Sequence, residues 1–367
     1  MASDDRMDLS ELQASIMREG ASWQAGQTSV SALSQEERRR RLGADLGDLT
    51  VEEIERQAAA RKAALDQEVR AVGAPAAFDS RNIGGSNYIT PIKDQGGCGS
   101  CVAFGTVAAI EGRFRRQRSD PTMQVDLSEA HLFYCHGRSK GRTCGNGWIP
   151  NEALDMCKTI GIVDEDCYPY TAADQNCSNL CSDWQNRVVK LTGWRQIAAV
   201  SDMKQWVADY GPLTACFIVY NDFFNYRSGV YRHVSGDVAG GHCVSIIGYD
   251  DGQGCWICKN SWGSGWGESG FFRIAYGDSG IDTWQVCAPE NILEIGWQYT
   301  KKIQGLWTNN ADRNGWVYVE SLGWRKIAAV NDNVHFDMLF QLMAAKAASR
   351  PVNLYQDNGV ITQLYVL

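Results

Sequence analysis

A cysteine at the start of an expected helix is the residue in this sequence with the clearest chemical potential. Cys101 ends the glycine-rich stretch 95–101, and apolar residues such as Phe104, Val107 and Ile110 follow it at helical spacing. This pattern predicts a loop that delivers Cys101 onto the first turn of a buried helix. Free backbone N–H groups and the positive end of the helix dipole favour a thiolate there, and the thiolate is the form of cysteine that attacks carbonyl carbons. Cys101 is therefore a candidate nucleophile.

Two other chemistries would use the same cysteine. Cys98 and Cys101 have the spacing of a redox pair. Together with Cys255 and Cys258 they could form a four-thiolate zinc site, although zinc modules hold their cysteine pairs much closer in sequence. A nucleophilic role for Cys101 requires the rest of the chain to supply a base.

His242 is the histidine best placed to be that base. It follows two glycines and precedes an apolar run that predicts a buried strand, so a rigid element would aim its ring. An imidazole that acts with a thiolate needs its second nitrogen held by a hydrogen-bond acceptor. Asn260 offers a side-chain carbonyl for this purpose, and Trp262 would shield the bond from water and strengthen it.

The other histidines have different surroundings. His131 and His136 flank Cys135, and a zinc site that also uses Cys144 is the alternative function for this group. The remaining two histidines, His233 and His335, lie in a hairpin-like stretch and near the end of the chain.

The elements that must position these residues fall into two halves. Residues 75–187 carry mainly helical patterns, whereas residues 188–297 carry strand-like runs separated by Gly, Asp or Asn. Because the candidate residues come from both halves, we expect them to meet in a cleft between the two.

Cys101, His242 and Asn260, in this order and each in its own local motif, resemble the papain-like cysteine peptidases. The similarity covers about residues 75–296. It implies an α+β fold of two lobes, with a helical lobe (75–187), an antiparallel β-barrel-like lobe (188–297) and a cleft between them.

The resemblance also implies a cysteine endopeptidase that hydrolyses peptide bonds through a thioester acyl-enzyme, without a cofactor or metal. Cys101 attacks the carbonyl, and His242 protonates the leaving amine and then activates water. The side-chain amide of Gln95 and the backbone N–H of Cys101 stabilise the oxyanion, typically by roughly 3 kcal/mol per donor. Trp262 supports the His242–Asn260 bond.

The same likeness implies where a polypeptide substrate lies. Gly147 and Trp148 stand where the family has two glycines that pair with the substrate backbone, and Trp266 resembles the wall on the leaving side. The other residues expected to line the substrate site and its main specificity pocket, which we expect to be apolar and uncharged, are Pro150, Ala215, Ala239, Gly241 and Ile292.

The cysteine pairs follow from the resemblance in part. It implies disulfides between Cys98 and Cys144 and between Cys135 and Cys177, and a third bond could join Cys157 and Cys167, which bracket a helix end. The sequence does not assign the other six, of which Cys216, Cys243 and Cys258 are expected as buried free thiols: Cys181, Cys216, Cys243, Cys255, Cys258 and Cys287.

Residues 1–74 are expected to be helical and, by position, a propeptide. Capping-box patterns at Ser34–Glu37 and Thr50–Glu53 predict two helix starts, the second helix continuing to about Ala71. The segment would inhibit the peptidase intramolecularly, so that the chain is a latent zymogen activated by cleavage between about Arg70 and Phe78. Acid would favour its release.

Residues 298–367 are expected to form a small α+β module with an unknown ligand. Its stretch 323–330 repeats the stretch 193–200 almost unchanged, and each copy precedes a predicted helix. We interpret the repeat as a shared strand-to-helix connection rather than as a solenoid.

Bulk properties exclude several classes of function. A net charge of −8 and a pI near 5.3 argue against a nucleic-acid partner. No apolar stretch reaches the roughly 18 residues that span a bilayer. The thirteen cysteines favour secretion or another oxidising compartment, although no signal peptide is visible.

Two alternatives stay open from the sequence alone. An amine could intercept the thioester, which would make the protein a transpeptidase. The peptidase part could also be vestigial, in a protein that binds a peptide or glycan through the aromatic residues Trp307, Trp316 and Trp324 of the last module.

Overall fold

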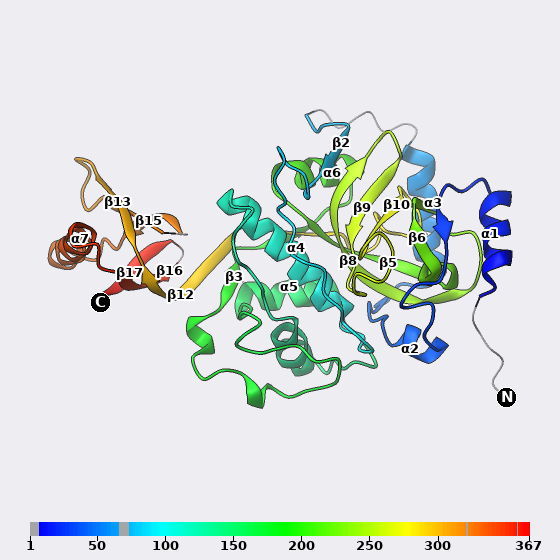
Figure 1. The fold of residues 1–367 in the computed structure, drawn as a ribbon, viewed down its shortest axis with the longest axis horizontal. Helices are drawn as coiled ribbons and strands as arrows, with labels where there is room; N and C mark the ends of the chain where they lie inside the picture. Colours follow the sequence, from blue (N-terminus) through cyan, green and yellow to red (C-terminus); the bar gives the residue numbers. More distant parts are fainter. Residues whose placement is uncertain (1–6, 66–72, 321, 358) are drawn as a thin grey trace.

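The computed structural model describes residues 7–65, 73–320, 322–357 and 359–367. It contains a helical lobe, a β-rich lobe, an N-terminal segment that packs mainly on the β-rich lobe, and a C-terminal module at the opposite end of the molecule (Figure 1). The mixed helical and strand content and the two lobes match the predicted α+β class.

Helix α4 (Cys101–Arg118) lies at the centre of the molecule and carries the candidate nucleophile at its first position. Most of its residues are buried, because it packs against helix α5 of the helical lobe and strands β5 and β8 of the β-rich lobe. The helix ends at Ser119, whose φ of 51° is left-handed. This confirms the predicted helix and its buried setting.

The helical lobe surrounds α4 with short elements joined by long loops. Helix α5 begins at a proline, as favoured at the first helical position. Residues 129–139 are helical, and the middle of this stretch, residues 131–137, is π-helical. These elements are η1 (His131–Gly137), α5 (Pro150–Thr159), η2 (Cys177–Asn179) and η3 (Trp184–Asn186).

The β-rich lobe is an eight-stranded sheet around a large hydrophobic core. The central strands β5 and β8 are antiparallel and almost entirely buried, which explains their continuous apolar sequences. The strand order is β4-β11-β5-β8-β9-β10-β7, with β2 paired to β8. The elements of this lobe are β2 (Ala77–Asp79), β4 (Trp194–Gln196), α6 (Val200–Asp209), β5 (Leu213–Tyr220), η4 (Asn221–Asn225), β6 (Tyr226–Ser228), β7 (Val230–Tyr231), β8 (Val238–Asp250), β9 (Cys255–Lys259), β10 (Phe271–Ala275) and β11 (Cys287–Pro289).

The N-terminal segment is held to the β-rich lobe at several places. Strand β1 (Gln24–Ala25) pairs with β6, and the buried Trp23 donates a hydrogen bond of 2.9 Å to the carbonyl of Arg232. Both predicted capping boxes are present, at the starts of α2 and α3. The helices are α1 (Leu9–Arg18), α2 (Gln35–Arg39) and α3 (Val51–Leu65).

The C-terminal module has a hydrophobic core of its own, made by residues between 303 and 361. Helix α7 covers one face of a mixed sheet whose order is β13-β14-β15-β17-β16-β12-β3. The elements of this module, which match the expected α+β content, are β13 (Ile303–Thr308), β14 (Gly315–Val319), β15 (Gly323–Ile327), α7 (Asp332–Ala347), β16 (Val352–Asp357) and β17 (Val360–Val366).

Strand β12 (Ile292–Lys301) joins the module to the rest of the molecule. Its first residues pair with β3 (Val189–Leu191), and its later residues pair with β16 of the module. The expected boundary at 297/298 therefore falls within a strand. The repeated stretches 193–200 and 323–330 contain β4 and β15, respectively. A helix follows each of these strands, which agrees with a shared strand-to-helix connection.

None of the helices in the described parts of the chain is long and apolar enough to cross a membrane.

Candidate active site

The structure brings His242 and Asn260 into direct contact at the end of the β-rich sheet. His242 lies in β8, and its Nε2 donates to Oδ1 of Asn260, which follows β9, over 2.8 Å. The backbone N–H of Ser261 donates to the same oxygen, which fixes the amide orientation. Nδ1 of His242 has no hydrogen-bond partner among the described residues, so it is the nitrogen left for chemistry.

Trp262 packs against the ring of His242, beside its bond to Asn260. The centres of the Trp262 and His242 rings are 4.6 Å apart, and the indole is almost completely buried. Its ring also packs edge-on against Trp266. This aromatic cover excludes water from the bond and strengthens it.

The side chain of Gln95 is fixed by three hydrogen bonds. Its Oε1 accepts from the Ser261 hydroxyl over 2.7 Å, and its Nε2 donates to the Cys98 carbonyl over 2.8 Å. Nε2 also donates over 3.0 Å to the carbonyl of Arg41 in the N-terminal segment. The amide proposed for the oxyanion is thus already bound to a peptide carbonyl.

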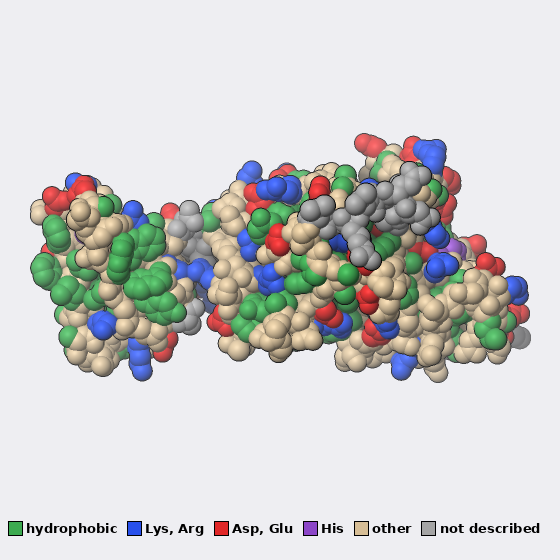
Figure 2. Space-filling model, turned by 90° about the horizontal axis from the view of Figure 1, so that it is seen from above, with side chains coloured by type: hydrophobic (Ala, Val, Ile, Leu, Met, Phe, Trp, Pro, Cys, Tyr) green, Lys and Arg blue, Asp and Glu red, His purple; other side chains and the backbone are tan. Residues whose placement is uncertain are grey.

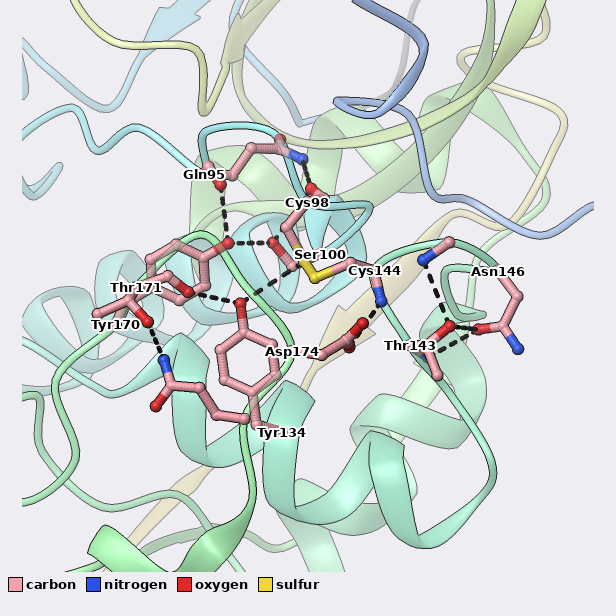
Figure 3. Close-up of a disulfide and its surroundings, with 12 residues drawn as sticks. Gln95, Cys98, Ser100, Tyr134, Thr143, Cys144, Asn146, Tyr170, Thr171 and Asp174 are labelled. Atoms are coloured by element: carbon pink, nitrogen blue, oxygen red, sulfur yellow. Dashed lines mark hydrogen bonds between the residues drawn. A yellow bond between two sulfur atoms is a disulfide. The ribbon is translucent and has the colours of Figure 1, made fainter. Parts of the chain in front are cut away.

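A disulfide and a tyrosine network hold the loop that carries Gln95 (Figure 3). Cys98 is bonded to Cys144, which ties the loop to the segment before Trp148. The Tyr170 hydroxyl donates to the backbone carbonyl of Gln95 over 2.8 Å and lies 2.7 Å from the Ser100 hydroxyl, immediately before Cys101. These contacts fix both ends of the loop.

Residues 41–45, which we call the inhibitory stretch, run through the cleft beside Cys101. The backbone N–H groups of Gly43 and Ala44 both donate to the carbonyl of Gly241 over 3.1 Å. On the other side, Trp148 donates to the Gly43 carbonyl over 2.8 Å and accepts from Asp45 over 2.9 Å. Gly147, Trp148 and Gly241 therefore contact a polypeptide, here the chain's own.

Glycines allow this close approach of backbone to backbone. A Cβ atom on Gly43 would lie 2.0 Å from the carbonyl oxygen of Gly99, and a Cβ on Gly147 would lie 2.0 Å from the carbonyl oxygen of Gly43. Real Cβ atoms do not approach this closely, so neither position tolerates a side chain without a shift of the backbone.

The two candidate reacting groups, Cys101 and His242, are buried while the inhibitory stretch is in place, and burial favours their uncharged forms. Burial raises the pKa of the Cys101 thiol well above its ordinary value, although backbone hydrogen bonds from Cys243, Gly43 and Val102 oppose the shift. Burial lowers the pKa of His242 to about 4, against the effect of the Asn260 hydrogen bond, and the charge of Arg41 lowers it further. A thiolate–imidazolium pair is therefore disfavoured in this state.

The expected specificity pocket needs correction. Ala215 packs inside the core of the β-rich lobe, because the next residue of β5, Cys216, is the one that faces the cluster containing Ala44. The other expected pocket residues lie in different places. Ile292 belongs to the same cluster as Cys216 and Ala44, Pro150 is buried at the start of α5, and Ala239 packs on the core of the β-rich lobe.

Two residues missed by the sequence reasoning are important here. Trp284 lies in the same buried cluster as Ala44, and Arg41 supplies the carbonyl bound by Gln95. Arg41 ends the basic run 38–41, which by itself indicates a solvated face rather than a place in the cleft, and a turn places Trp284. Trp266 is fully buried beside Trp262 in this latent form.

The disulfides agree with the expectation for two pairs and differ for the third. Cys135 is bonded to Cys177, as is Cys98 to Cys144, but Cys167 is bonded to Cys181 rather than to Cys157. Cys157 lies on the buried face of α5 and is free.

The zinc and redox alternatives lose their ligands to these bonds. Cys98, Cys135 and Cys144 are all in disulfides, and His131 and His136 bind backbone groups. Among the described residues no group of three or more His, Cys, Asp or Glu side chains is placed to hold a metal ion.

The chain is similar to known proteases. The model of the papain family cysteine proteases matches residues 74–290. Cathepsin B-like CP2 of Giardia intestinalis is 37% identical over 214 residues, which are 55% of this chain and 69% of that protein. The gut-specific cysteine proteinase of Caenorhabditis elegans is 34% identical over 241 residues, or 59% and 73% of the two chains.

Solved structures of protease precursors resemble about three quarters of this chain. ProCathepsin B S9 from Trypanosoma congolense has a TM-score of 0.60 and 25% identity, covering 77% of this chain and 98% of that chain. Digestive procathepsin L 3 of the Tenebrio molitor larval midgut has a TM-score of 0.59 and 27% identity, covering 77% and 88%. The chain belongs to the papain family of cysteine proteases, as a zymogen with its propeptide in the cleft.

Proposed function

We propose that Cys101, His242, Asn260 and Gln95 carry out the endopeptidase reaction of this zymogen. The observation that carries the proposal is the hydrogen bond from Gln95 Nε2 to the Arg41 carbonyl. Through this bond Gln95 holds a peptide carbonyl close to Cys101, the first residue of α4. The His242–Asn260 bond supports the proposal from the opposite lobe.

In the proposed reaction the Cys101 sulfur attacks the scissile carbonyl carbon. The developing oxyanion accepts hydrogen bonds from Gln95 Nε2 and the Cys101 N–H, each typically contributing roughly 3 kcal/mol. His242 passes its Nδ1 proton to the leaving amine, which leaves a thioester on Cys101. His242 then takes a proton from water, the hydroxide attacks the thioester, and the thiol and a new carboxylate are released.

Latency has an electrostatic cause in this proposal. The inhibitory stretch excludes water from Cys101 and His242, and burial disfavours the charged form of both groups. Removal of the stretch hydrates both side chains, so that the ion pair forms. Activation by cleavage between about Arg70 and Phe78 is part of the proposal; residues 66–72 lie outside the described chain.

A cleavage assay tests the assigned residues. The processed enzyme is incubated with an unfolded protein, and the new termini are identified by mass spectrometry. We expect internal cleavage by the wild type, none by Cys101→Ala, and unchanged cleavage by Cys157→Ala, which removes a buried free thiol of α5. Cleavage by Cys101→Ala would contradict the assignment. Addition of a primary amine separates hydrolysis from transpeptidation, because only the latter yields amine-capped products.

We also propose that the C-terminal module binds a glycan. Three indoles line a pocket of about 400 Å³ on this module: Trp307, Trp316 and Trp324. Figure 2 shows hydrophobic side chains gathered on the surface of the module. The Trp316 Nε1 donates to Asn314 over 2.9 Å, which fixes this ring, and flat uncharged rings suit the C–H faces of sugars.

Glycan binding is tested by retention on immobilised polysaccharides. We expect Trp324→Ala to lose retention and Tyr365→Ala, at an exposed position outside the pocket, to keep it. Equal retention of both variants, or none for the wild type, would contradict this role.

A further inference from the structure

Ala44 follows Gly43 in the inhibitory stretch, and its small side chain has little room around it. Ala44 is only 5% exposed and forms a parallel bridge with Trp148, the expected substrate-pairing residue. Its N–H is bound by the carbonyl of Gly241. The Ala44 methyl group therefore occupies the place on the cleft where the side chain of a bound polypeptide enters the buried cluster.

Trp284 lies directly beside this place. A Cβ atom built on Gly241 would lie 2.3 Å from the carbonyl oxygen of Ala44 and 2.8 Å from Cη2 of Trp284. The outer edge of the indole is thus pressed against the Gly241 backbone, directly beside Ala44. Trp284 is 1% exposed and shares its hydrophobic cluster with Ala44, Cys216 and Ile292.

The turn that carries Trp284 is anchored on several sides. The N–H of Trp284 donates to the Gly280 carbonyl over 2.9 Å, and the neighbouring Ser279 accepts from Ile218 of β5 over 2.8 Å. Within the turn, the Asp282 carboxylate accepts from the Trp256 indole over 3.0 Å. These bonds fix the backbone at Trp284, so the ring has few ways to leave the pocket.

We infer that Trp284 limits the main specificity pocket to small side chains, so that the enzyme prefers Ala, Gly or Ser at P2, the residue preceding the one that is acylated. The inference rests on the proposed function. A leucine or phenylalanine at P2 needs volume that the indole already fills, and overpacking of a rigid pocket weakens binding. Ala44 is the side chain this pocket accepts in the latent protein.

Short fluorogenic peptides test the inference on the processed full-length enzyme. The peptides carry an equal mixture of residues at P1 and Ala, Leu or Phe at P2. For the wild type we expect kcat/KM at least about tenfold higher for Ala than for Phe. Trp284→Ala is expected to reverse this order. Trp297→Ala, which removes an indole stacked on Tyr365 of the C-terminal module, should keep the wild-type order.

The outcomes separate the inference from the function on which it rests. An enzyme that cleaves peptides but prefers Leu or Phe at P2, or whose preference is unchanged in Trp284→Ala, contradicts the inference alone. An enzyme that cleaves none of the peptides and whose Cys101 resists thiol-directed epoxides contradicts the proposed function as well. If Trp284→Ala does not fold, Trp284→Leu replaces it, and the wild-type preference still decides.

Discussion

The side-chain amide of Gln95 donates a hydrogen bond of 3.0 Å to the backbone carbonyl of Arg41, although 54 positions separate the two residues in sequence. The charge of Arg41 is held in turn by Asp94, 2.7 Å away, the residue before Gln95. The protein thus places its own peptide group on the proposed oxyanion donor, and an ion pair one residue away secures it.

Breaking that ion pair should weaken inhibition modestly. Arg41→Ala is expected to raise the inhibition constant of added propeptide by roughly three- to tenfold, since a half-exposed pair typically contributes about 1 kcal/mol. The measurement is titration of the processed enzyme with propeptide variants. Arg40→Ala, whose pair with Glu36 is solvent-exposed, serves as control and should change nothing. Equal effects of the two variants would contradict a specific role for Arg41.

Gly43→Ala should disrupt inhibition more strongly. The new Cβ would lie 2.0 Å from the Gly99 carbonyl oxygen, so the inhibitory stretch must move out of its hydrogen bonds with Gly241 and Trp148. We expect faster processing of the precursor, and gel electrophoresis of samples taken over time measures the rate. Asp48→Ala, an exposed change in the same segment, is the control. Processing at the wild-type rate would show that the stretch does not fill the cleft.

Acid should loosen the propeptide through His242. In the precursor its pKa is lowered from 6.5 to about 4 by burial and, to a smaller extent, by the charge of Arg41. Departure of the inhibitory stretch removes Arg41 and exposes the ring, so we expect a proton to bind better once the cleft is open. Propeptide binding is therefore fully favourable above about pH 6.5 and weakens as the pH falls toward 4. Calorimetry of propeptide with processed Cys101→Ala enzyme measures this trend. Affinity that is constant or rises over this range would contradict it.

Protonation of Asp45 should also weaken propeptide binding, at a lower pH than protonation of His242. Burial raises the pKa of its carboxyl group, but hydrogen bonds from the Gly47 N–H and from Arg142, 2.7 Å away, outweigh burial and leave the pKa below its ordinary value. The ion pair is thus lost as the pH falls through this lowered pKa. Asp45→Asn should reduce the acid dependence below about pH 4 and leave the part due to His242.

Loss of the Asn260 side chain should lower kcat for peptide hydrolysis more than it lowers the reactivity of the Cys101 thiol. Asn260→Ala removes the 2.8 Å acceptor of His242 Nε2, and loss of a buried hydrogen bond costs about 1–3 kcal/mol, or roughly 10- to 100-fold in kcat. Asn179→Ala, at an exposed position of η2, is the control. Activity of Asn260→Ala within twofold of wild type would show that the bond does not orient the ring.

The C-terminal module should be removable without loss of peptidase activity. Its core lies within residues 303–361, and β12 pairs with β3 through residues 292–294 alone. Truncation after Gln298 is expected to leave peptide hydrolysis unchanged. Truncation after Asn291, which removes the pairing partner of β3 and the buried Ile292, should lower the melting temperature. Equal stability of the two truncations would contradict this boundary.

The sequence predicted the fold where local signals were strong. Cys101 at the start of α4, the strand-rich part 188–297 and both capping boxes follow from periodicity and capping chemistry. The sequence alone could not predict that Cys216, rather than Ala215, faces the cluster containing Ala44. Alternation along a strand tells which residues share a face, but β5 is buried on both faces.

Long-range pairing was the other gap. The bond of Cys167 to Cys181, instead of to Cys157, depends on where an irregular loop returns to the helical lobe. The path of residues 41–45 through the cleft has no helical or strand period at all. Such contacts are set by tertiary packing, so only the structure could reveal Arg41, Gly43 and Trp284 as parts of the site.

Alkylation of the precursor and the processed enzyme by a thiol-directed epoxide shows whether Cys101 is the nucleophile that the N-terminal segment covers. Intact mass and peptide mapping give the number and position of labelled cysteines. We expect one label, on Cys101, that appears only after the propeptide is removed, while the six other free thiols stay unlabelled because they are buried in the lobes. Labelling of Cys101 at equal rates in both forms, or labelling of another cysteine in its place, would contradict this expectation.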